Sequence, residues 1–256
     1  MKFTKMHGLG NDFMVVETIT QSIDINQLPI VQLANRHTGV GFDQLLWIES
    51  SKEADFACRF FNADGSEAEQ CGNGLRCVAR FIREEKLTEK NLLSIATKAG
   101  KIEIVCNDFN AICVTMGHPS EIKIIAIDDK ELITLSMGNP HAILRVDNIA
   151  TPPVVEWGQH IATHHLFPQG TNVGFVEVVN QHHIFLRTFE RGVGETYACG
   201  SNACAAAVAG IHQGWLTSPV QVESILGSLA IEWQENHPVV MTGPAVRVFQ
   251  GVIMPL

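Results

Sequence analysis

The sequence lacks the features of several large protein classes. No stretch approaches the ~20 consecutive apolar residues of a membrane-spanning helix. The first residues, MKFTKMHGLGNDF, include no apolar core of a secretory signal. Acidic residues outnumber basic ones by 27 to 18, and the net charge of −9 disfavours binding to nucleic acid or to an anionic membrane. We therefore expect a cytoplasmic protein that binds neither.

Signals for metals, cofactors and disulfides are missing as well. There is no C-x-x-C pair, and the side chains of His164-His165 and of His182-His183 point apart in regular structure. No glycine-rich phosphate loop is present. The seven cysteines, an odd number without a secretory signal, indicate thiols in a reducing compartment. We expect no metal and no cofactor.

The most informative feature that is present is an internal repeat with a spacing of 128 residues, half the chain. Cys71-Gly72 recurs as Cys199-Gly200, and Gly10-Asn11 recurs as Gly138-Asn139. Further matches in the same register are Gln44 with Asn172, Arg59 with Arg187, and Glu67 with Glu195. This period is too long for a solenoid and indicates two copies of one domain.

Short strand patterns dominate both halves, and a helix follows each repeated cysteine. The spacing of apolar residues predicts helices at 25–36, 72–85, 154–164 and 201–212. We predict an α+β fold of two pseudo-symmetric domains, each a curled, mostly antiparallel, β-barrel-like sheet around a central helix. The N-terminal domain covers residues 1–118 and the C-terminal domain covers 119–246, while the tail at about 247–256 returns to the first domain.

Cys71 and Cys199 are each predicted to lie where a loop meets a helix N-terminus. The unpaired N–H groups and the helix dipole favour an anion there, so the pKa of the thiol falls below its usual ~8.5. The same N–H groups can hold a substrate carboxylate. In a cleft between the domains, a thiolate and a thiol could take a proton from one face of a carbon and return one to the other. The other five cysteines fall inside predicted strands or helices, and we interpret them as core residues.

Amide side chains recur at repeat positions, which pair Asn11 with Asn139 and Gln44 with Asn172. An Asn after Gly is usually a turn residue. The recurrence instead favours a ligand site, because an amide offers a zwitterion both a donor and an acceptor. The symmetry breaks where Glu190-Arg191 replaces Asn62-Ala63. Arg can bind a carboxylate and Glu can accept from an ammonium, so we expect a substrate with a second charged end.

Six motifs make the chain resemble the diaminopimelate epimerase family from end to end: MHGLGNDF, GFDQLL, FFNADGSEAEQCGNGLRCVARF, MGNPHA, GTNVGF and ERGVGETYACGSNACAA. The resemblance implies that a homodimer converts LL-2,6-diaminopimelate to meso-diaminopimelate without a cofactor, in lysine and peptidoglycan precursor biosynthesis. It implies that Cys71 and Cys199 are the acid and base. It also implies substrate contacts, with His141 in a supporting role, for Asn11, Gln44, Asn62, Gly72, Asn73, Asn139, Asn172, Glu190, Arg191, Gly200 and Ser201.

One residue departs from the family pattern. Many members have Gly after the second Cys-Gly-Ser, where this chain has Asn202. The position lies in the first turn of a predicted helix, where Asn can be accommodated. We expect no change of activity from it.

Three other functions remain open at this point. A proline or hydroxyproline racemase of the same fold also uses two cysteines, but its substrate lacks the second charged end. A redox protein could use Cys71 and Cys199 as a disulfide switch, and a binding protein could hold an amino acid without reacting. The paired amides argue against the redox protein, which would not need them. Retention of both cysteines argues against the binding protein.

Overall fold

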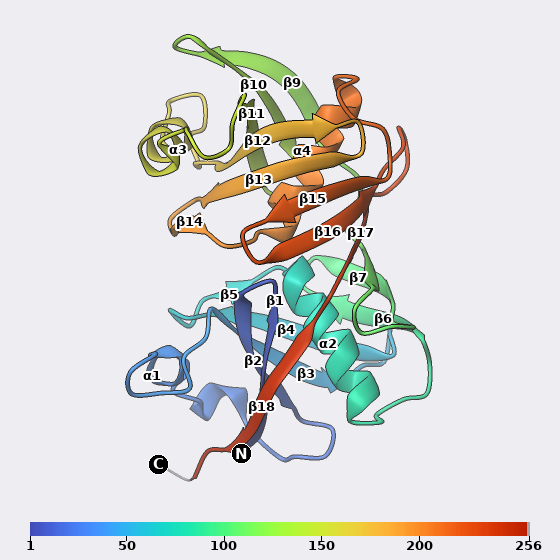
Figure 1. Ribbon diagram of the computed structural model, residues 1–256. Coiled ribbons are helices and arrows are strands. Elements are labelled where there is room, and N and C mark those ends of the chain that lie inside the picture. The colour runs from blue at the N-terminus through green and yellow to red at the C-terminus, as the bar shows by residue number, and fades with distance from the viewer. Residues whose placement is uncertain (255–256) are drawn as a thin grey trace. The chain divides into compact units, whose positions relative to one another are not determined.

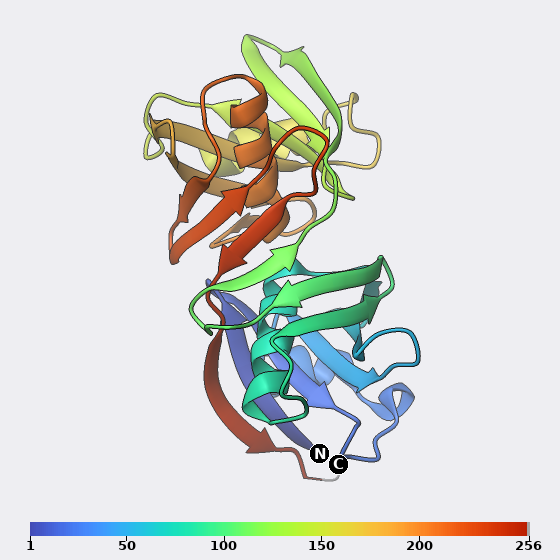
Figure 2. The ribbon, with the colours of Figure 1, turned by 90° about the vertical axis from the view of Figure 1, so that its right-hand side faces the viewer.

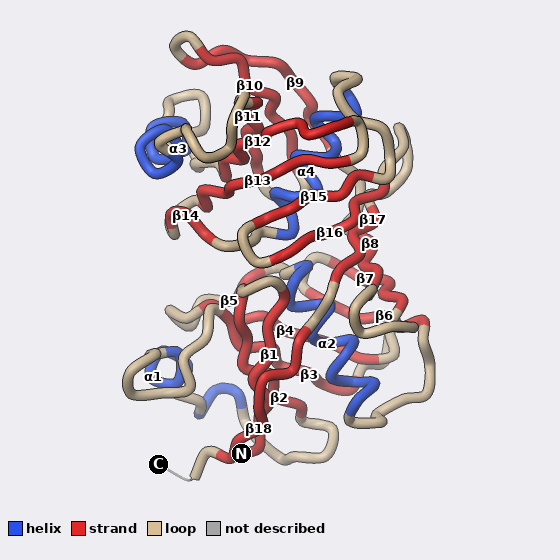
Figure 3. Tube along the Cα trace, in the orientation of Figure 1, coloured by secondary structure: helices blue, strands red, loops and turns tan. Residues whose placement is uncertain are grey.

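The computed structural model describes residues 1–254, which form two compact units. Unit 1 comprises Met1–Val114 and the segment from Gly243 onward, and unit 2 comprises Thr115–Thr242. Strands make up most of the regular structure, with few helices (Figure 3). The predicted α+β class is confirmed. Within the described residues, the sheet of each unit stays open and does not close into a barrel.

Unit 1 begins with a hairpin of β1 (Lys2–Gly8) and β2 (Asn11–Glu17), followed by the 3-10 turn η1 (Ile25–Gln27) and the short helix α1 (Ile30–Ala34). Its remaining elements are β3 (Gln44–Ser50), β4 (Phe56–Asn62), β5 (Glu67–Ala68), α2 (Gly72–Glu84), β6 (Leu92–Thr97), β7 (Gly100–Val105), β8 (Ile112–Thr115) and β18 (Val246–Val252) (Figure 1).

Unit 2 contains the elements between β8 and β18 in the chain. They are β9 (Ser120–Ile127), β10 (Lys130–Ser136), β11 (Pro140–Arg145), α3 (Val154–Ala162), β12 (Asn172–Asn180), β13 (His183–Glu190), β14 (Gly194–Thr196), α4 (Gly200–His212), β15 (Val220–Ser224), β16 (Gly227–Glu232) and β17 (Val240–Gly243).

The strand order is the same in the two units. In unit 1 the order is β18-β1-β2-β3-β4-β6-β7-β8, with β2–β3 and β4–β6 parallel and the other neighbours antiparallel. In unit 2 the order is β9-β10-β11-β12-β13-β15-β16-β17, with β11–β12 and β13–β15 parallel. The repeat found in the sequence is therefore a repeat of topology, and residues 128 positions apart occupy equivalent places.

The end of the chain supplies one strand of unit 1. β18 pairs antiparallel with β1 and lies beside it in both views (Figures 1 and 2). Arg247 in β18 forms an ion pair with Glu84 in α2, with 3.1 Å between Nη1 and Oε2. β18 thus occupies in unit 1 the position that β9 occupies in unit 2. Pro255 and Leu256, at the end of the predicted returning tail, lie outside the described residues.

α2 and α4 are the central helices of their units. α2 packs against β1, β2, β3, β7 and β18, and α4 packs against β10 to β13, β15 and β16. Every residue from Gly72 to Ala79 in α2, and from Asn202 to Gly210 in α4, is buried. The small side chains of α4 let the surrounding strands approach it closely. Each helix therefore begins at a fixed place in a packed core.

The predicted helix at 25–36 is wrong. The segment forms η1 and then α1, a helix of only five residues. Pro29 separates them, because it has no N–H to donate and disfavours a helical backbone at the residue before it. Leu28 is accordingly extended, with ψ 126°.

Candidate active site

The two repeated cysteines occupy the N-cap positions of the central helices. Cys71 has an extended backbone (φ −146°, ψ 114°) before α2, and Cys199 has a similar one (φ −126°, ψ 116°) before α4. Ser, Thr, Asp or Asn is favoured at an N-cap, where its side-chain oxygen accepts from a helical N–H and contributes about 1 kcal/mol. Cysteine provides little of that stabilisation. Thiol chemistry therefore accounts better than helix stability for a cysteine at both caps.

The first turns of α2 and α4 create a positive potential at the two sulfur atoms. The first N–H groups of a helix have no intrahelical acceptor, and neither first turn contains an acidic residue. The N–H of Gly74 lies 3.5 Å from Sγ of Cys71. The hydroxyl oxygen of Ser201 lies 3.4 Å from Sγ of Cys199. The start of a helix in general favours the thiolate form of a cysteine, and the same N–H groups can bind an anionic ligand.

The chain reaches each N-cap from a short hairpin that the same ion pair holds together. Arg59 in β4 contacts Glu67 in β5 through two bonds, Nε–Oε1 at 2.8 Å and Nη2–Oε2 at 3.1 Å. Arg187 in β13 contacts Glu195 in β14 in the same way, at 2.7 and 3.1 Å. A bidentate pair fixes direction as well as distance. The same bidentate ion pair therefore stabilises the hairpin before the cysteine in both units.

Asn11 connects β2 to the start of α2. It follows a tight turn in which Leu9 and Gly10 have φ values of 54° and 88°. Its Nδ2 donates to Oδ2 of Asp43 at 2.9 Å, and its Oδ1 is thereby turned toward α2. There Oδ1 accepts from Nδ2 of Asn73 at 3.3 Å and from the thiol of Cys71 at 3.6 Å. We call Asn11, Cys71 and Asn73 the unit 1 cluster.

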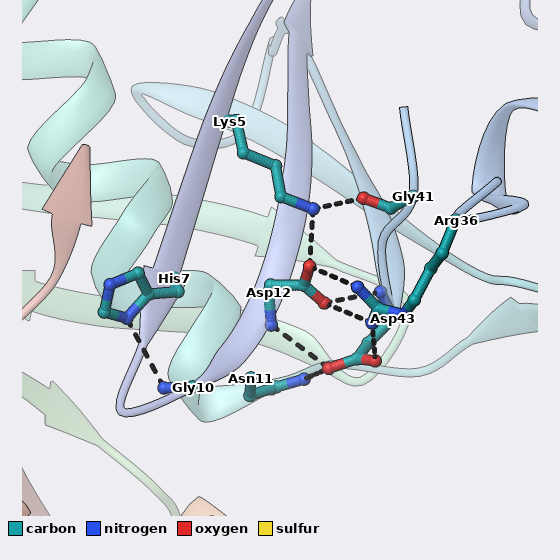
Figure 4. A network of polar contacts seen from close by, with 8 residues as sticks. All are labelled: Lys5, His7, Gly10, Asn11, Asp12, Arg36, Gly41 and Asp43. Atoms are coloured by element: carbon teal, nitrogen blue, oxygen red, sulfur yellow. Dashed lines mark hydrogen bonds and ion pairs between the residues drawn. The ribbon is translucent and has the colours of Figure 1, made fainter. Parts of the chain in front are cut away.

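A charged network holds Asn11 in this orientation (Figure 4). Arg36 bridges two carboxylates, with 2.8 Å from Nη2 to Oδ1 of Asp12 and 2.8 Å to Oδ1 of Asp43. Lys5 lies on the other side of Asp12, 2.5 Å away, and also donates to the carbonyl of Gly41. Burial alone would raise the pKa of Asp12, but the hydrogen bonds from Arg36 and Lys5 outweigh it and hold the pKa well below its usual range.

Gln44 and Asn62 face each other across β3 and β4. Nε2 of Gln44 donates to Oδ1 of Asn62 at 2.8 Å, and Nδ2 of Asn62 donates to the hydroxyl of Ser66 at 3.0 Å. Among residues 1–254, Oε1 of Gln44 and Oδ1 of Asn73 are buried without a hydrogen-bond partner. A buried unsatisfied acceptor costs about 1–3 kcal/mol. Both oxygens are therefore unsatisfied acceptors within unit 1.

In unit 2, Asn172 fixes the turn that carries Glu190 and Arg191. Oδ1 of Asn172 accepts from the backbone N–H of Arg191 at 3.0 Å. The carboxylate of Glu190 accepts from the hydroxyl of Thr196 at 2.6 Å. The guanidinium of Arg191 is exposed and donates to the carbonyl of Gln169 at 2.7 Å. Opposite charges are thus placed side by side at the position where unit 1 has Asn62 and Ala63.

His141 lies at the centre of a buried polar group in unit 2. Its Nδ1 is 3.1 Å from Oδ1 of Asn202, and its Nε2 is 3.0 Å from Oδ1 of Asn139. Only 1% of His141 is exposed. Burial lowers the pKa of His141 to about 4, although the hydrogen bond to Asn202 acts in the opposite direction. The imidazole is therefore neutral at physiological pH.

Contacts join most of the predicted residues into groups. The unit 1 cluster unites Asn11, Cys71 and Asn73, while the other groups are Gln44–Asn62, Asn139–His141, Asn172–Arg191 and Cys199–Ser201. Sequence reasoning missed Arg36 and Asp43, which orient Asn11, and it did not foresee the contacts of Asn202. The signal for Asp43 was its place in the GFDQLL motif, but its contact with Asn11 spans 32 positions in the chain.

Three other cysteines have a different environment. Cys58, Cys77 and Cys106 are buried, and burial raises the pKa of each thiol, to about 12 for Cys77 and about 11 for Cys106. These thiols stay protonated near neutral pH. Cys71 and Cys199, by contrast, are partly exposed.

The described residues offer no assembled metal site. His160 in α3 and His164, which follows the end of α3, have ring centroids separated by 6.0 Å, and His160 also contacts Asp128 at 2.9 Å. Even so, within residues 1–254 no three or more His, Cys, Asp or Glu side chains are arranged to hold a metal ion. In the same part of the chain, no helix combines the length and apolar character needed to cross a membrane.

Comparison with known sequences gives a match over nearly the whole chain. Residues 3–122 and 133–248 match the family model of diaminopimelate epimerase. The chain is 50% identical to the diaminopimelate epimerase of Ectopseudomonas mendocina (strain ymp), over 99% of both chains. It is 51% identical to the diaminopimelate epimerase of Stutzerimonas stutzeri (strain A1501), again over 99% of both.

Solved structures share the fold at much lower identity. A phenazine biosynthesis protein of the PhzF family from Bacillus anthracis has a TM-score of 0.76 at 18% identity, covering 99% of both chains. A hydroxyproline epimerase from Agrobacterium vitis, with bound trans-4-hydroxy-L-proline, has a TM-score of 0.72 at 16% identity, covering 98% of this chain and 91% of the other. Likeness at this level of identity shows the fold alone.

The charged network of unit 1 makes stability depend on pH. The pKa of Asp12 in the folded state lies below its unfolded value of ~4. The stabilisation that the ionised carboxylate gives the fold is therefore complete above pH ~4 and is lost as the pH falls further. We predict that Asp12→Asn lowers the free energy of unfolding at pH 7 by about 3 kcal/mol, because the partly buried Lys5 loses its only carboxylate partner among the described residues. The variant should also lose stability less steeply than the wild type below pH ~4.

Chemical denaturation at a series of pH values measures both effects. Asp129→Asn is the matched control, since it removes the exposed ion pair between Asp129 and Lys130. It should leave both the stability and its pH dependence close to those of the wild type. Equal behaviour of the two variants would contradict the role given to Asp12.

Proposed function

The chain belongs to the diaminopimelate epimerase family, and on that premise we propose that Cys71 and Cys199 are the two groups that move the proton when it converts LL-diaminopimelate to meso-diaminopimelate. One observation carries this assignment. The two cysteines are the N-caps of equivalent central helices in two copies of one fold unit. Such duplication supplies two thiols of matched geometry, as an inversion at one carbon requires.

The reaction breaks one C–H bond and forms another on the opposite face of the α-carbon. In the direction from LL to meso, the thiolate of Cys71 takes the α-proton and becomes a thiol. The thiol of Cys199 gives its proton to the other face and becomes a thiolate. In the reverse direction the roles exchange. The mechanism requires both sulfur atoms to reach one α-carbon, one from each face, and we propose that the two units together provide this arrangement.

The α-proton of an amino acid is very weakly acidic, so the negative charge left on the substrate must be stabilised. We assign this task to the backbone N–H groups at the starts of the two helices, those of Gly72, Asn73, Gly200 and Ser201. They bind the substrate carboxylate, onto which the charge moves as the proton leaves. This proposal needs no cofactor and no metal.

The remaining polar residues recognise the substrate. Diaminopimelate carries a carboxylate and an ammonium at each end, so the site needs acceptors as well as donors. We propose that Arg191 binds the distal carboxylate and Glu190 the distal ammonium. The amides that complete the site are Asn11, Gln44, Asn62, Asn139 and Asn172. His141 supports Asn139, which lies 3.0 Å from its Nε2.

The alternative functions have less support. The likeness to a hydroxyproline epimerase is limited to 16% identity, whereas relatives that are 50% identical over the full length carry the name diaminopimelate epimerase. A redox switch at Cys71 and Cys199 would give no role to the amides around them. Assaying the enzyme with LL-diaminopimelate and with hydroxyproline separates these functions. We also propose that it acts in the cytoplasm, in lysine and peptidoglycan precursor biosynthesis.

Replacement of either N-cap cysteine should slow epimerisation strongly. We predict that Cys71→Ala and Cys199→Ala each lower kcat/KM in both directions by about 10²- to 10⁴-fold, the usual contribution of a positioned acid or base. Circular dichroism detects inversion of the substrate. Cys77→Ala and Cys204→Ala are matched controls, because they remove buried cysteines from the same two helices. A Cys199→Ala enzyme that still epimerised at a near-normal rate would end the two-base assignment.

We propose that the protein forms a homodimer through β18, the edge strand of the unit 1 sheet. Its exposed apolar residues include Val248 (54% exposed) and Val252 (62% exposed). An edge strand of this kind is suited to pair with a second copy. Sedimentation equilibrium should give twice the chain mass of 28.1 kDa.

Val248→Glu should halve the sedimenting mass, because it places a charge on this edge. Ile124→Glu, on the equivalent strand β9, is the control and should not change the mass. A wild-type protein that sediments as a monomer at micromolar concentration would refute the dimer.

A further inference from the structure

Four residues around the first turn of the central helix differ together between the two units. Unit 1 has Phe13, Leu46, Phe60 and Gly74, and 128 positions later unit 2 has His141, Gly174, Thr188 and Asn202. In unit 1, a Cβ on Gly74 would lie 3.0 Å from the Leu46 side chain and 3.1 Å from the Phe60 ring. In unit 2, a Cβ on Gly174 would lie 3.0 Å from Oδ1 of Asn202. One core region is thus apolar in unit 1 and polar in unit 2.

The orientation of the Asn202 amide is fixed by its surroundings. Asn202 is fully buried, and its Nδ2 donates to the carbonyl of Val173 at 3.2 Å and to the hydroxyl of Thr188 at 3.0 Å. A main-chain carbonyl can only accept, so the NH2 end of the amide must face Val173. Oδ1 of Asn202 therefore faces Nδ1 of His141, 3.1 Å away. Since Oδ1 can only accept, Nδ1 must carry the proton.

A neutral imidazole has a single N–H. Burial lowers the pKa of His141 to about 4, so the ring carries no second proton at neutral pH. Its Nε2 is then a lone pair, which lies 3.0 Å from Oδ1 of Asn139. Two acceptors facing each other are unfavourable. The two ends of an amide have nearly the same shape, so half a turn of the Asn139 amide replaces this contact with a hydrogen bond from Nδ2 to Nε2.

We propose that Asn202 is a positioning residue, which holds His141 as the Nδ1–H tautomer and through it directs Nδ2 of Asn139 toward the ring and Oδ1 of Asn139 away from it. The inference rests on the proposed function only where it gives Asn139 a substrate to bind. Asn139 then meets a ligand as an acceptor. This suits the ammonium of an amino acid, which an N–H donor would repel.

The repeat partner of Asn139 is held in the same way by different chemistry. Nδ2 of Asn11 donates to the carboxylate of Asp43, and Oδ1 of Asn11 is turned toward Cys71. The carboxylate of Asp43 thus accepts from Nδ2 of Asn11, as the lone pair of His141 accepts from Nδ2 of Asn139 in the proposal. The two asparagines are then oriented alike, each with Nδ2 bound to the protein and Oδ1 on the opposite side, although the residues that bind Nδ2 differ.

The tautomer of His141 can be read directly from the unliganded wild-type enzyme. Long-range proton–nitrogen NMR spectra distinguish a protonated ring nitrogen from one with a lone pair, and His141→Phe, which copies Phe13 of unit 1, identifies the signals by their absence. We expect a protonated Nδ1 and a lone pair on Nε2. A protonated Nε2 would overturn the proposal. The measurement needs no substrate, so its outcome does not depend on the proposed function.

Two variants separate positioning from packing. Asn202→Ala removes the acceptor for Nδ1, and we expect the protonated Nδ1 signal to be lost and kcat/KM to fall by about 10-fold as Asn139 loses its orientation. Thr188→Val removes one hydrogen bond of the same buried group but leaves the carbonyl of Val173 to hold Nδ2 of Asn202. It should keep both the tautomer and the activity.

An Asn202→Ala enzyme that keeps a protonated Nδ1 would contradict the proposal. So would a Thr188→Val enzyme that loses as much activity as Asn202→Ala, because packing alone would then explain both. If the tautomer changes as expected while turnover of diaminopimelate is absent in the wild type as well, the positioning role stands and the proposed function fails.

Discussion

The N–H groups at the starts of α2 and α4 set the chemistry of the two sulfur atoms beside them. The buried bodies of these helices fix where those groups lie, and the ion pairs Arg59–Glu67 and Arg187–Glu195 fix the hairpins that lead to the cysteines. The positive end of a helix lowers the pKa of a thiol and so favours the thiolate near neutral pH. A carboxylate whose α-carbon is losing a proton needs the same field. In the proposed mechanism, one structural element therefore meets two requirements of the proton transfer.

Duplication gives the fold two equivalent N-cap cysteines, and divergence gives unit 2 polar and charged residues that unit 1 lacks. Asn11 and Asn139 stay matched, and each follows a glycine with a positive φ value. Farther out, Glu190 and Arg191 replace Asn62 and Ala63. The residues that orient the matched amides differ as well, with a carboxylate behind Asn11 and an imidazole beside Asn139. In the proposed site a ligand would contact only the amide, so the residues behind it can differ between the units.

The α+β fold and the family were predicted correctly from the sequence, because the repeat and the motifs can be recognised from the order of the residues alone. The prediction failed at 25–36, where Pro29 outweighed an apolar spacing that suits a helix. The roles of Arg36 and Asp43 depend on contacts over 24 to 32 positions, which no local pattern encodes. Asn202 stood out only as a departure from the family and was expected to be neutral. Its partners Val173 and Thr188 became visible in the folded core. The assignment of the site residues stays a prediction.

The fate of the α-hydrogen tests the central claim most directly. LL-diaminopimelate is converted in deuterated water, and mass spectrometry with stereochemical separation follows the isotope early in the reaction. If Cys71 takes the proton and Cys199 supplies another, the first meso product carries deuterium at the inverted carbon, while unreacted LL substrate keeps its hydrogen. Meso product that retains the original hydrogen would mean that a single group moves the proton between the faces, and would contradict the account.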